Sequence, residues 1–207
     1  LPQFLPARLV LDLGCGNGNL AELLKSKGFS GIYVGVDENT YFLERAVEAT
    51  RDGEAGSYIF IQGSLADSNW MEMVDHADVI CSFAALHHLP GEDLHRLFFS
   101  TISSKLSPSG HLFLSCWQVL GNPRLEKHLV PWGPMEINSP SINQADLLLD
   151  WRADPGKPAK LRYVHHFSPQ ELRNLGESQG LILQDEFYSD GKEGNLGLYQ
   201  VWQKPCS

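Results

Sequence analysis

Short apolar runs alternate along the chain with segments whose apolar residues recur every three or four positions. The runs rich in β-branched residues predict buried strands at 8–13, 32–36, 58–62, 78–82 and 110–116. The segments with helical periodicity lie at 18–27, 40–51 and 92–106. Strands that alternate with helices in this way predict an α/β fold with a doubly wound, mostly parallel sheet.

The pattern changes in the second half of the chain. Residues 107–110, Ser-Pro-Ser-Gly, predict a turn that ends the third helix and leads into the strand at 110–116. The periodicity is then lost as far as about residue 163, in a segment with many prolines. Ser168 and Pro169 predict the start of a helix that continues to about Gln179, followed by strands at 181–188 and 197–203. We expect a single domain over 1–207 with a substrate-side insertion, or lid, at about 118–163.

Composition narrows the class of protein. A chain of 207 residues with 43% hydrophobic residues suits one globular domain. Its four cysteines are far apart and match no metal-ligand spacing, which indicates reduced thiols in a cytoplasmic protein and predicts no metal site. No stretch has the length and apolarity of a membrane span, so we expect no membrane association.

Charge is unevenly distributed. The net charge of −9 argues against general binding of nucleic acids, because phosphate contacts need Lys and Arg. Residues 118–163 nevertheless contain six Lys or Arg and five Asp or Glu, whereas the rest of the chain contains ten and twenty. The stretch WRADPGKPAKLRYVHH at 151–166 is the most basic part. It is either a solvated loop or a surface for an acidic ligand.

The stretch LVLDLGCGNGNLAELL at 9–24 predicts a strand, a glycine turn and a helix. Such a turn brings backbone N–H groups and a helix N-terminus close to a ligand, most simply a nucleotide-like cofactor. Asn19 occupies the position where the dinucleotide motif has its last glycine, which disfavours an NAD-dependent dehydrogenase. Asp37 ends the next strand, where its carboxylate can accept hydrogen bonds from both hydroxyls of a ribose. A glycine turn with only a packing role is the alternative.

These motifs resemble those of class I S-adenosylmethionine-dependent methyltransferases. VLDLGCGNGNL is similar to their first motif, VGVDEN to their second, and ADVICSFAALHHL with LSPSGHLFLS to their fourth strand and the segment after it. The resemblance implies a Rossmann-like, seven-stranded, mostly parallel sheet with an antiparallel last strand. It also implies S-adenosyl-L-methionine as the cofactor.

The same resemblance assigns cofactor-binding residues. The turn from Gly14 through Gly16 to Gly18 would line the methionine part, Asp37 would hold the ribose, and Phe83 and Ala84 would contact the sulfonium. Ser64 stands where the family often has an Asp for the adenine amino group, and a serine offers a weaker acceptor. The remaining members of the implied set are Asp12, Cys15, Asn17, Glu38 and Leu65.

Acceptor-side candidates follow the fourth and fifth strands. Methyl transfer is an in-line displacement, so alignment is the main need, and a base is needed only when the acceptor carries a proton. His87, His88 and Trp117 lie where open α/β sheets bind ligands. The alternative is that the two histidines only pack and form local hydrogen bonds.

A narrower resemblance links CWQ, LVPW at 129–132 and RYVHHFSPQEL at 162–172 to the family that methylates the carboxylate of 5-carboxymethyluridine at the tRNA wobble position. It implies that Arg162 and His165 hold the acceptor anion, that Trp117 and Trp132 stack on a base, and that a small activator subunit assists, as in eukaryotic members. A carboxylate is already a nucleophile at neutral pH and needs a cation rather than a base. The alternatives are a small acidic or heteroatom-bearing metabolite as the acceptor, or a non-catalytic protein that binds S-adenosylmethionine.

Overall fold

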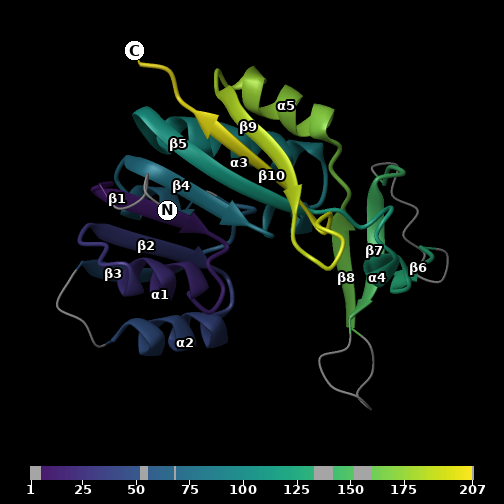
Figure 1. Ribbon diagram of the computed structural model, residues 1–207, viewed down its shortest axis with the longest axis horizontal. Helices are drawn as coiled ribbons and strands as arrows, with labels where there is room; N and C mark the ends of the chain where they lie inside the picture. The colour runs from purple at the N-terminus through teal and green to yellow at the C-terminus, as the bar shows by residue number, and fades with distance from the viewer. Residues whose placement is uncertain (1–5, 52–55, 68, 133–141, 152–159, 207) are drawn as a thin grey trace.

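The computed structural model describes residues 6–51, 56–67, 69–132, 142–151 and 160–206 (Figure 1). Its larger sheet has seven strands in the order β3-β2-β1-β4-β5-β10-β9, and β10 is antiparallel to both of its neighbours. The predicted doubly wound sheet with an antiparallel last strand is confirmed. The strands are β1 (Leu9–Leu13), β2 (Ile32–Asp37), β3 (Ser57–Gln62), β4 (Ala77–Phe83), β5 (Leu106–Trp117), β9 (Ile182–Ser189) and β10 (Gly197–Gln203).

Helices cover both faces of this sheet, which explains why its central strands are apolar throughout. The helix α1 (Asn19–Ser26) packs on one face through Ala21 and Leu24, together with α2 (Thr40–Thr50). On the other face lie α3 (Glu92–Lys105) and α5 (Pro169–Ser178), with short 3-10 turns η1 (Asn69–Met73) and η2 (Leu86–His88). Ser168 caps α5 by accepting a hydrogen bond from the Glu171 N–H at 3.1 Å, as predicted. None of the described helices is both long and apolar enough to cross a membrane.

The predicted turn at 107–110 lies inside a strand. The strand β5 begins at Leu106, which pairs with Ala77, whereas His111 pairs with Val79. The residues between Leu106 and His111 therefore leave the ladder as a bulge, and Ser109 adopts a φ of +63° there. The turn residues were recognised correctly, but the strand starts earlier than residue 110.

The segment predicted to lack periodicity contains a second, three-stranded antiparallel sheet in the order β6-β7-β8. Its strands are β6 (Leu129–Val130), β7 (Asp146–Trp151) and β8 (Lys160–His165), and a short helix α4 (Pro123–Glu126) precedes them. Val119, Leu125, Leu149 and Val164 form its small core. Residues 152–159 of the basic stretch lie outside the described residues.

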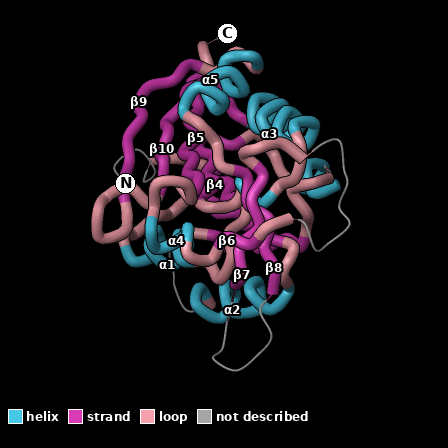
Figure 2. Tube along the Cα trace, turned by 90° about the vertical axis from the view of Figure 1, so that its right-hand side faces the viewer, coloured by secondary structure: helices cyan, strands magenta, loops and turns pink. Residues whose placement is uncertain are grey.

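The smaller sheet lies at the carboxyl ends of the parallel strands. In Figure 1 the arrowheads of β2 and β4 point to the side that carries β7 and β8, and Figure 2 shows β6, β7 and β8 in front of the larger sheet. The strand order reverses between β1 and β4, and ligands of open α/β sheets bind at such a switch point. The fold therefore places the smaller sheet on the side of the larger sheet where such ligands bind.

Candidate active site

The glycine turn after β1 is tied to the end of β2. The N–H groups of Gly14 and Cys15 donate to the Val36 carbonyl oxygen at 2.8 and 3.1 Å. Gly14, Gly16 and Gly18 have φ values of +78°, +54° and +81°, a region that residues with a Cβ adopt only at a cost. The three glycines are therefore required by the path of the backbone.

Asp37 connects the same two strand ends. Its Oδ2 accepts a hydrogen bond from the Gly16 N–H at 2.9 Å, and its Oδ1 accepts one from the Asn39 N–H at 2.9 Å. Each carboxylate oxygen has a second lone pair for a ribose hydroxyl. A Cβ built on Gly16 would meet no atom within 4 Å, so open space adjoins the turn. These residues fit S-adenosylmethionine, and the assignment of the turn to its methionine part and of Asp37 to its ribose remains a prediction.

Asp12 and Cys15 support the turn from inside the protein. Asp12 is 4% exposed and accepts a hydrogen bond from the Tyr33 hydroxyl at 2.5 Å. Burial raises the pKa of Asp12 to about 7, against the effect of the Tyr33 hydrogen bond. Cys15 is buried against β2, since a Cβ on Gly35 would lie 2.8 Å from its Sγ, and burial raises the pKa of its thiol. Direct contact with a cofactor remains a prediction for these two buried residues.

The other expected cofactor residues lie around the turn. Asn17 and Glu38 are exposed, whereas Ser64 and Leu65 are partly buried. The Ser64 hydroxyl oxygen accepts a hydrogen bond from the Ala66 N–H at 3.3 Å. This bond uses part of the oxygen's capacity to accept hydrogen bonds within its own loop. A Cβ on Gly14 would lie 3.8 Å from the Leu65 Cδ1, so Leu65 reaches the turn.

The end of β4 has an unusual backbone. Ala84 has a φ of +54°, and its N–H donates to both the carbonyl oxygen and the hydroxyl of Ser115, at 3.0 and 3.1 Å. A residue other than glycine in this conformation is strained and occurs most often at functional sites. The preceding Phe83 ring lies 6.4 Å from the Tyr199 ring, between their centroids. The expected contact of Phe83 and Ala84 with the sulfonium remains a prediction.

Four of the five predicted acceptor-side residues form one cluster, the acceptor cluster: His87, His88, Trp117 and Arg162. The ring centroids of His87 and His88 lie 4.9 and 5.5 Å from that of Trp117. The Arg162 guanidinium carbon lies 5.9 Å from the centroid of the Trp117 ring. The cluster thus combines residues from η2, β5 and β8 at the carboxyl ends of the parallel strands.

The hydrogen bonds of the two histidines fix their neutral forms. The Trp117 N–H donates to His87 Nδ1 at 3.4 Å, so His87 Nε2 carries the hydrogen. His88 Nδ1 donates to the Tyr163 carbonyl oxygen at 3.0 Å, which leaves the lone pair on His88 Nε2. Burial, followed by the positive charge of neighbouring groups including Arg162, lowers the pKa of His87 well below its ordinary value. Burial also lowers the pKa of His88, so Arg162 is the fixed cation of the cluster.

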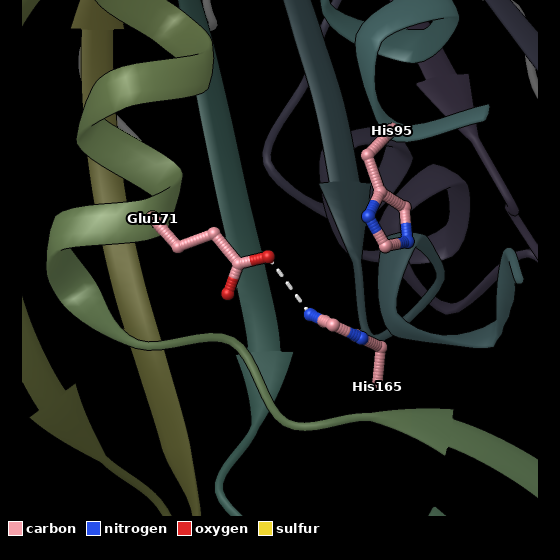
Figure 3. A group of neighbouring side chains, drawn as sticks. All are labelled: His95, His165 and Glu171. Carbon is pink, nitrogen blue, oxygen red and sulfur yellow. Dashed lines mark hydrogen bonds and ion pairs between the residues drawn. The ribbon is translucent and has the colours of Figure 1, made fainter. Parts of the chain in front are cut away.

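His165 does not join this cluster. Its Nδ1 lies 2.7 Å from Asp146 Oδ1 and its Nε2 lies 2.9 Å from Glu171 Oε1, as Figure 3 shows for Glu171. Two carboxylates repel an acceptor anion, so His165 cannot hold one. Successive side chains of a strand point to opposite faces, and sequence alone did not show which face of β8 meets Trp117.

Trp132 also lies apart from Trp117. Its Nε1–H donates to the Asp146 carbonyl oxygen at 2.9 Å, and its ring lies 6.4 Å from that of Tyr163. Trp117 lies beside Arg162 and Trp132 beside Tyr163, and these two neighbours on β8 point to opposite faces of the strand, so the two tryptophans are not brought together on one face.

Sequence reasoning missed three residues that shape the site: Tyr33, Ser115 and Tyr199. Tyr33 bonds to Asp12, Ser115 holds the strained Ala84, and Tyr199 packs on Phe83. Tyr33 is on β2 and pairs with Val10 of β1. A polar side chain inside an apolar strand is a signal that could have identified Tyr33 and Ser115 as partners of buried polar groups.

We predict different outcomes for alanine at two glycines of the turn. In Gly14→Ala the new Cβ would lie 2.4 Å from the Ala85 Cβ, so overpacking adds to the cost of the positive φ. We expect about 2–4 kcal/mol of lost stability. In Gly16→Ala the new Cβ would meet no atom within 4 Å, so the free energy of unfolding should fall by only about 1–2 kcal/mol. This variant should also weaken cofactor binding. Urea unfolding of both variants measures the difference, and equal losses would contradict the packing assigned to Gly14.

The strand order, the glycine turn and the position of Asp37 agree with the fold that the resemblance to class I methyltransferases implies. The family described as "Methyltransferase domain" (Methyltransf_23) matches residues 2–185, and the chain belongs to this family. The family, the fold and the open turn identify an S-adenosylmethionine-dependent methyltransferase.

Solved structures agree with this fold at low sequence identity. A SAM-dependent methyltransferase from Methanosarcina mazei is 20% identical with a TM-score of 0.72, covering 96% of this chain and 93% of that chain. The N-methyltransferase NodS from Bradyrhizobium japonicum WM9, in complex with S-adenosyl-L-homocysteine, is 14% identical with a TM-score of 0.64, covering 96% and 79%. Magnesium protoporphyrin IX methyltransferase from Synechocystis PCC 6803, with the same ligand, is 18% identical with a TM-score of 0.65, covering 97% and 75%. No curated protein matches the chain.

Proposed function

We propose that the chain methylates an anionic acceptor, and that a carboxylate oxygen receives the methyl group. The observation that carries this proposal is the partly buried Arg162 guanidinium beside the Trp117 ring, at the carboxyl ends of β4 and β5. When bound, S-adenosylmethionine supplies a methyl group on a positively charged sulfur. A carboxylate needs placement rather than deprotonation, and a cation next to a flat ring provides placement.

His87 supports the same class of acceptor. Its Nε2 carries a hydrogen, is buried, and has no hydrogen-bond partner among the described residues. An unpaired buried donor costs about 1–3 kcal/mol, which an acceptor oxygen would recover. Arg162 and His87 both donate, so the acceptor that suits them offers lone pairs rather than protons.

Within this class, the carboxylate of 5-carboxymethyluridine in tRNA is our first candidate. The segments CWQ, LVPW and RYVHHFSPQEL support it, as does the position of Arg162 beside Trp117. The net charge of −9 favours a small carboxylic acid instead, because a tRNA surface needs many basic contacts. The neighbours named N-methyltransferase and magnesium protoporphyrin IX methyltransferase show that this fold serves different acceptors.

A transfer assay with methyl-labelled S-adenosylmethionine tests the proposal. Bulk tRNA from cells that lack their own carboxymethyluridine methylation and a small-metabolite extract serve as parallel acceptors, each with and without the family's small activator. Label that mild alkali releases establishes a methyl ester, and the fraction that carries it distinguishes tRNA from a metabolite. Label that resists alkali in both fractions would contradict a carboxylate acceptor.

Arg162→Gln should lower turnover on an anionic acceptor by about 10- to 100-fold, the effect of one lost charged hydrogen bond, with cofactor affinity unchanged. Lys160→Gln is the matched control, because Lys160 is an exposed cation at the start of the same strand. The measurements are acceptor-dependent transfer rates and calorimetric titration with S-adenosylmethionine. If Arg162→Gln weakened cofactor binding instead, Arg162 would belong to the cofactor half of the site.

A second candidate is methyl transfer to a protonated heteroatom of a small metabolite, with His88 as the base. The observation in its favour is the His88 Nδ1 bond to the Tyr163 carbonyl oxygen, which leaves a basic lone pair on Nε2. His88→Gln separates the two functions. It should abolish transfer to a protonated acceptor, whereas a carboxylate acceptor should retain most of its rate.

A further inference from the structure

A second cluster of polar side chains lies on the Tyr163 side of β8, away from Arg162. His95 of α3, His165 at the end of β8 and Glu171 in the first turn of α5 each offer one ligand atom, and these atoms lie within 4.8 Å of one another (Figure 3). Both histidines are 1% exposed. Methyl transfer in the acceptor cluster makes no use of these three side chains.

His165 has the bonding pattern of a metal ligand. Its Nδ1 lies 2.7 Å from Asp146 Oδ1, so Nδ1 carries a hydrogen and donates it. Its Nε2 then faces Glu171 Oε1 at 2.9 Å. Metal-bound histidines commonly donate their outer N–H to a carboxylate in this way, which fixes the ring and directs the other nitrogen to the ion.

His95 shows the same pattern with a backbone acceptor. Its Nε2 lies 2.8 Å from the Leu89 carbonyl oxygen, so Nε2 donates and Nδ1 has a lone pair. This Nδ1 is buried with no hydrogen-bond partner among the described residues. A proton on His165 Nε2 would satisfy Glu171 but would leave His95 Nδ1 unpaired. A cation between the three side chains satisfies all of them.

We propose that His95 Nδ1, His165 Nε2 and Glu171 bind a divalent transition-metal ion, with zinc as the best fit. Two imidazole nitrogens and one carboxylate oxygen are a common zinc set that leaves one coordination position open. Glu171 is the exposed member, with a side-chain exposure of 33%, and gives the ion its access. Donors around tetrahedral zinc lie roughly 3.4 Å apart. Binding would therefore separate His165 Nε2 and Glu171 Oε1, now 2.9 Å apart, and would draw in the donor atoms that lie farther apart, at up to 4.8 Å.

The ion would join three elements that the chain brings together from distant segments. It would attach the end of β8 to α3 and α5, and β8 also carries Arg162. The ion would therefore hold the smaller sheet against the larger one, with its fourth coordination position open to solvent. The hydrogen-bond geometry of the three side chains supports this metal site whatever the methyl acceptor is.

Metal binding to the full chain tests this proposal directly. The chain is first treated with a chelator. Zinc is then titrated into it in competition with a chromophoric chelator, and cobalt is titrated while visible absorption is recorded. The melting temperature is measured with and without zinc. We expect one zinc per chain, a cobalt spectrum of nitrogen and oxygen ligands, and a higher melting temperature with zinc, because a ligand of the native state stabilises it. Cobalt–thiolate bands would overturn the assignment.

Glu171→Gln and His95→Phe should each weaken zinc binding by more than about 10-fold, a loss that outer partners of ligands alone can cause. Glu177→Gln is the matched control, an exposed carboxylate on the same helix. The Glu171 side chain is partly exposed, so Glu171→Gln removes no packing. This variant therefore remains informative even if His95→Phe fails to fold. Wild-type affinity in Glu171→Gln, or stoichiometric zinc absent from the wild-type chain, would overturn the proposal.

Discussion

Replacing Asp37 with alanine is expected to weaken S-adenosylmethionine binding by about 1.5–3 kcal/mol, or about 10- to 150-fold. The loss has two physical sources. The ribose hydroxyls lose a charged acceptor, and the N–H groups of Gly16 and Asn39 lose the carboxylate that orders the turn. Calorimetric titration of the cofactor into the folded variant measures the effect.

Two further variants separate these sources. Asp37→Asn keeps one acceptor oxygen but no charge, and we expect an intermediate loss. Glu44→Ala removes an exposed carboxylate from α2 and should leave the affinity unchanged. An unchanged dissociation constant in Asp37→Ala, with the circular dichroism of the native fold, would refute the ribose assignment.

Asp12→Asn should change the dependence of stability on pH. Burial raises the pKa of Asp12 to about 7, above the roughly 3.9 of an unfolded Asp. The folded state therefore holds a proton that the unfolded state releases between these two pKa values. The contribution of Asp12 to the free energy of unfolding is most favourable below about pH 4 and is lost as pH rises through 7.

Asp12→Asn keeps an oxygen that can accept the Tyr33 hydrogen bond, but its side chain does not ionise. Relative to Asp12→Asn, the wild-type chain should lose roughly 2–3 kcal/mol of unfolding free energy between pH 5 and pH 8. Urea unfolding of both proteins at the two pH values gives this number. Asp93→Asn, at an exposed position in the first turn of α3, should show no such difference from wild type. Parallel behaviour of the wild type and Asp12→Asn would show that Asp12 is ionised in the native state.

The larger sheet was predictable because its signals are local. The inner parallel strands β1, β2 and β4 are largely buried on both faces and therefore appear as short apolar runs. Glycines, Asn39 and Ser168 mark where helices begin. The position of Asp37 was predictable for the same reason, since it ends one of these runs. Its bonds to the Gly16 and Asn39 N–H groups were not, because they depend on the three-dimensional path of the turn.

The smaller sheet was not predictable from periodicity. Strand β7 contains Leu147, Leu148 and Leu149 in succession, which gives no alternation, and it is stabilised by its pairing with β8. The face to which each residue of β8 points depends on that pairing. Arg162 and His165 are three residues apart and lie on opposite faces of any strand, but only the structure shows that this segment is a strand and that the Arg162 face meets Trp117.

A crystal structure of the chain with bound S-adenosylhomocysteine is the decisive test of the cofactor and acceptor sites. We expect the ribose hydroxyls within hydrogen-bonding distance of Asp37, the methionine part along the turn from Gly14 to Gly18, and the thioether sulfur facing the acceptor cluster at Trp117 and Arg162. A ligand bound away from Asp37, or with its sulfur directed away from that cluster, would contradict it.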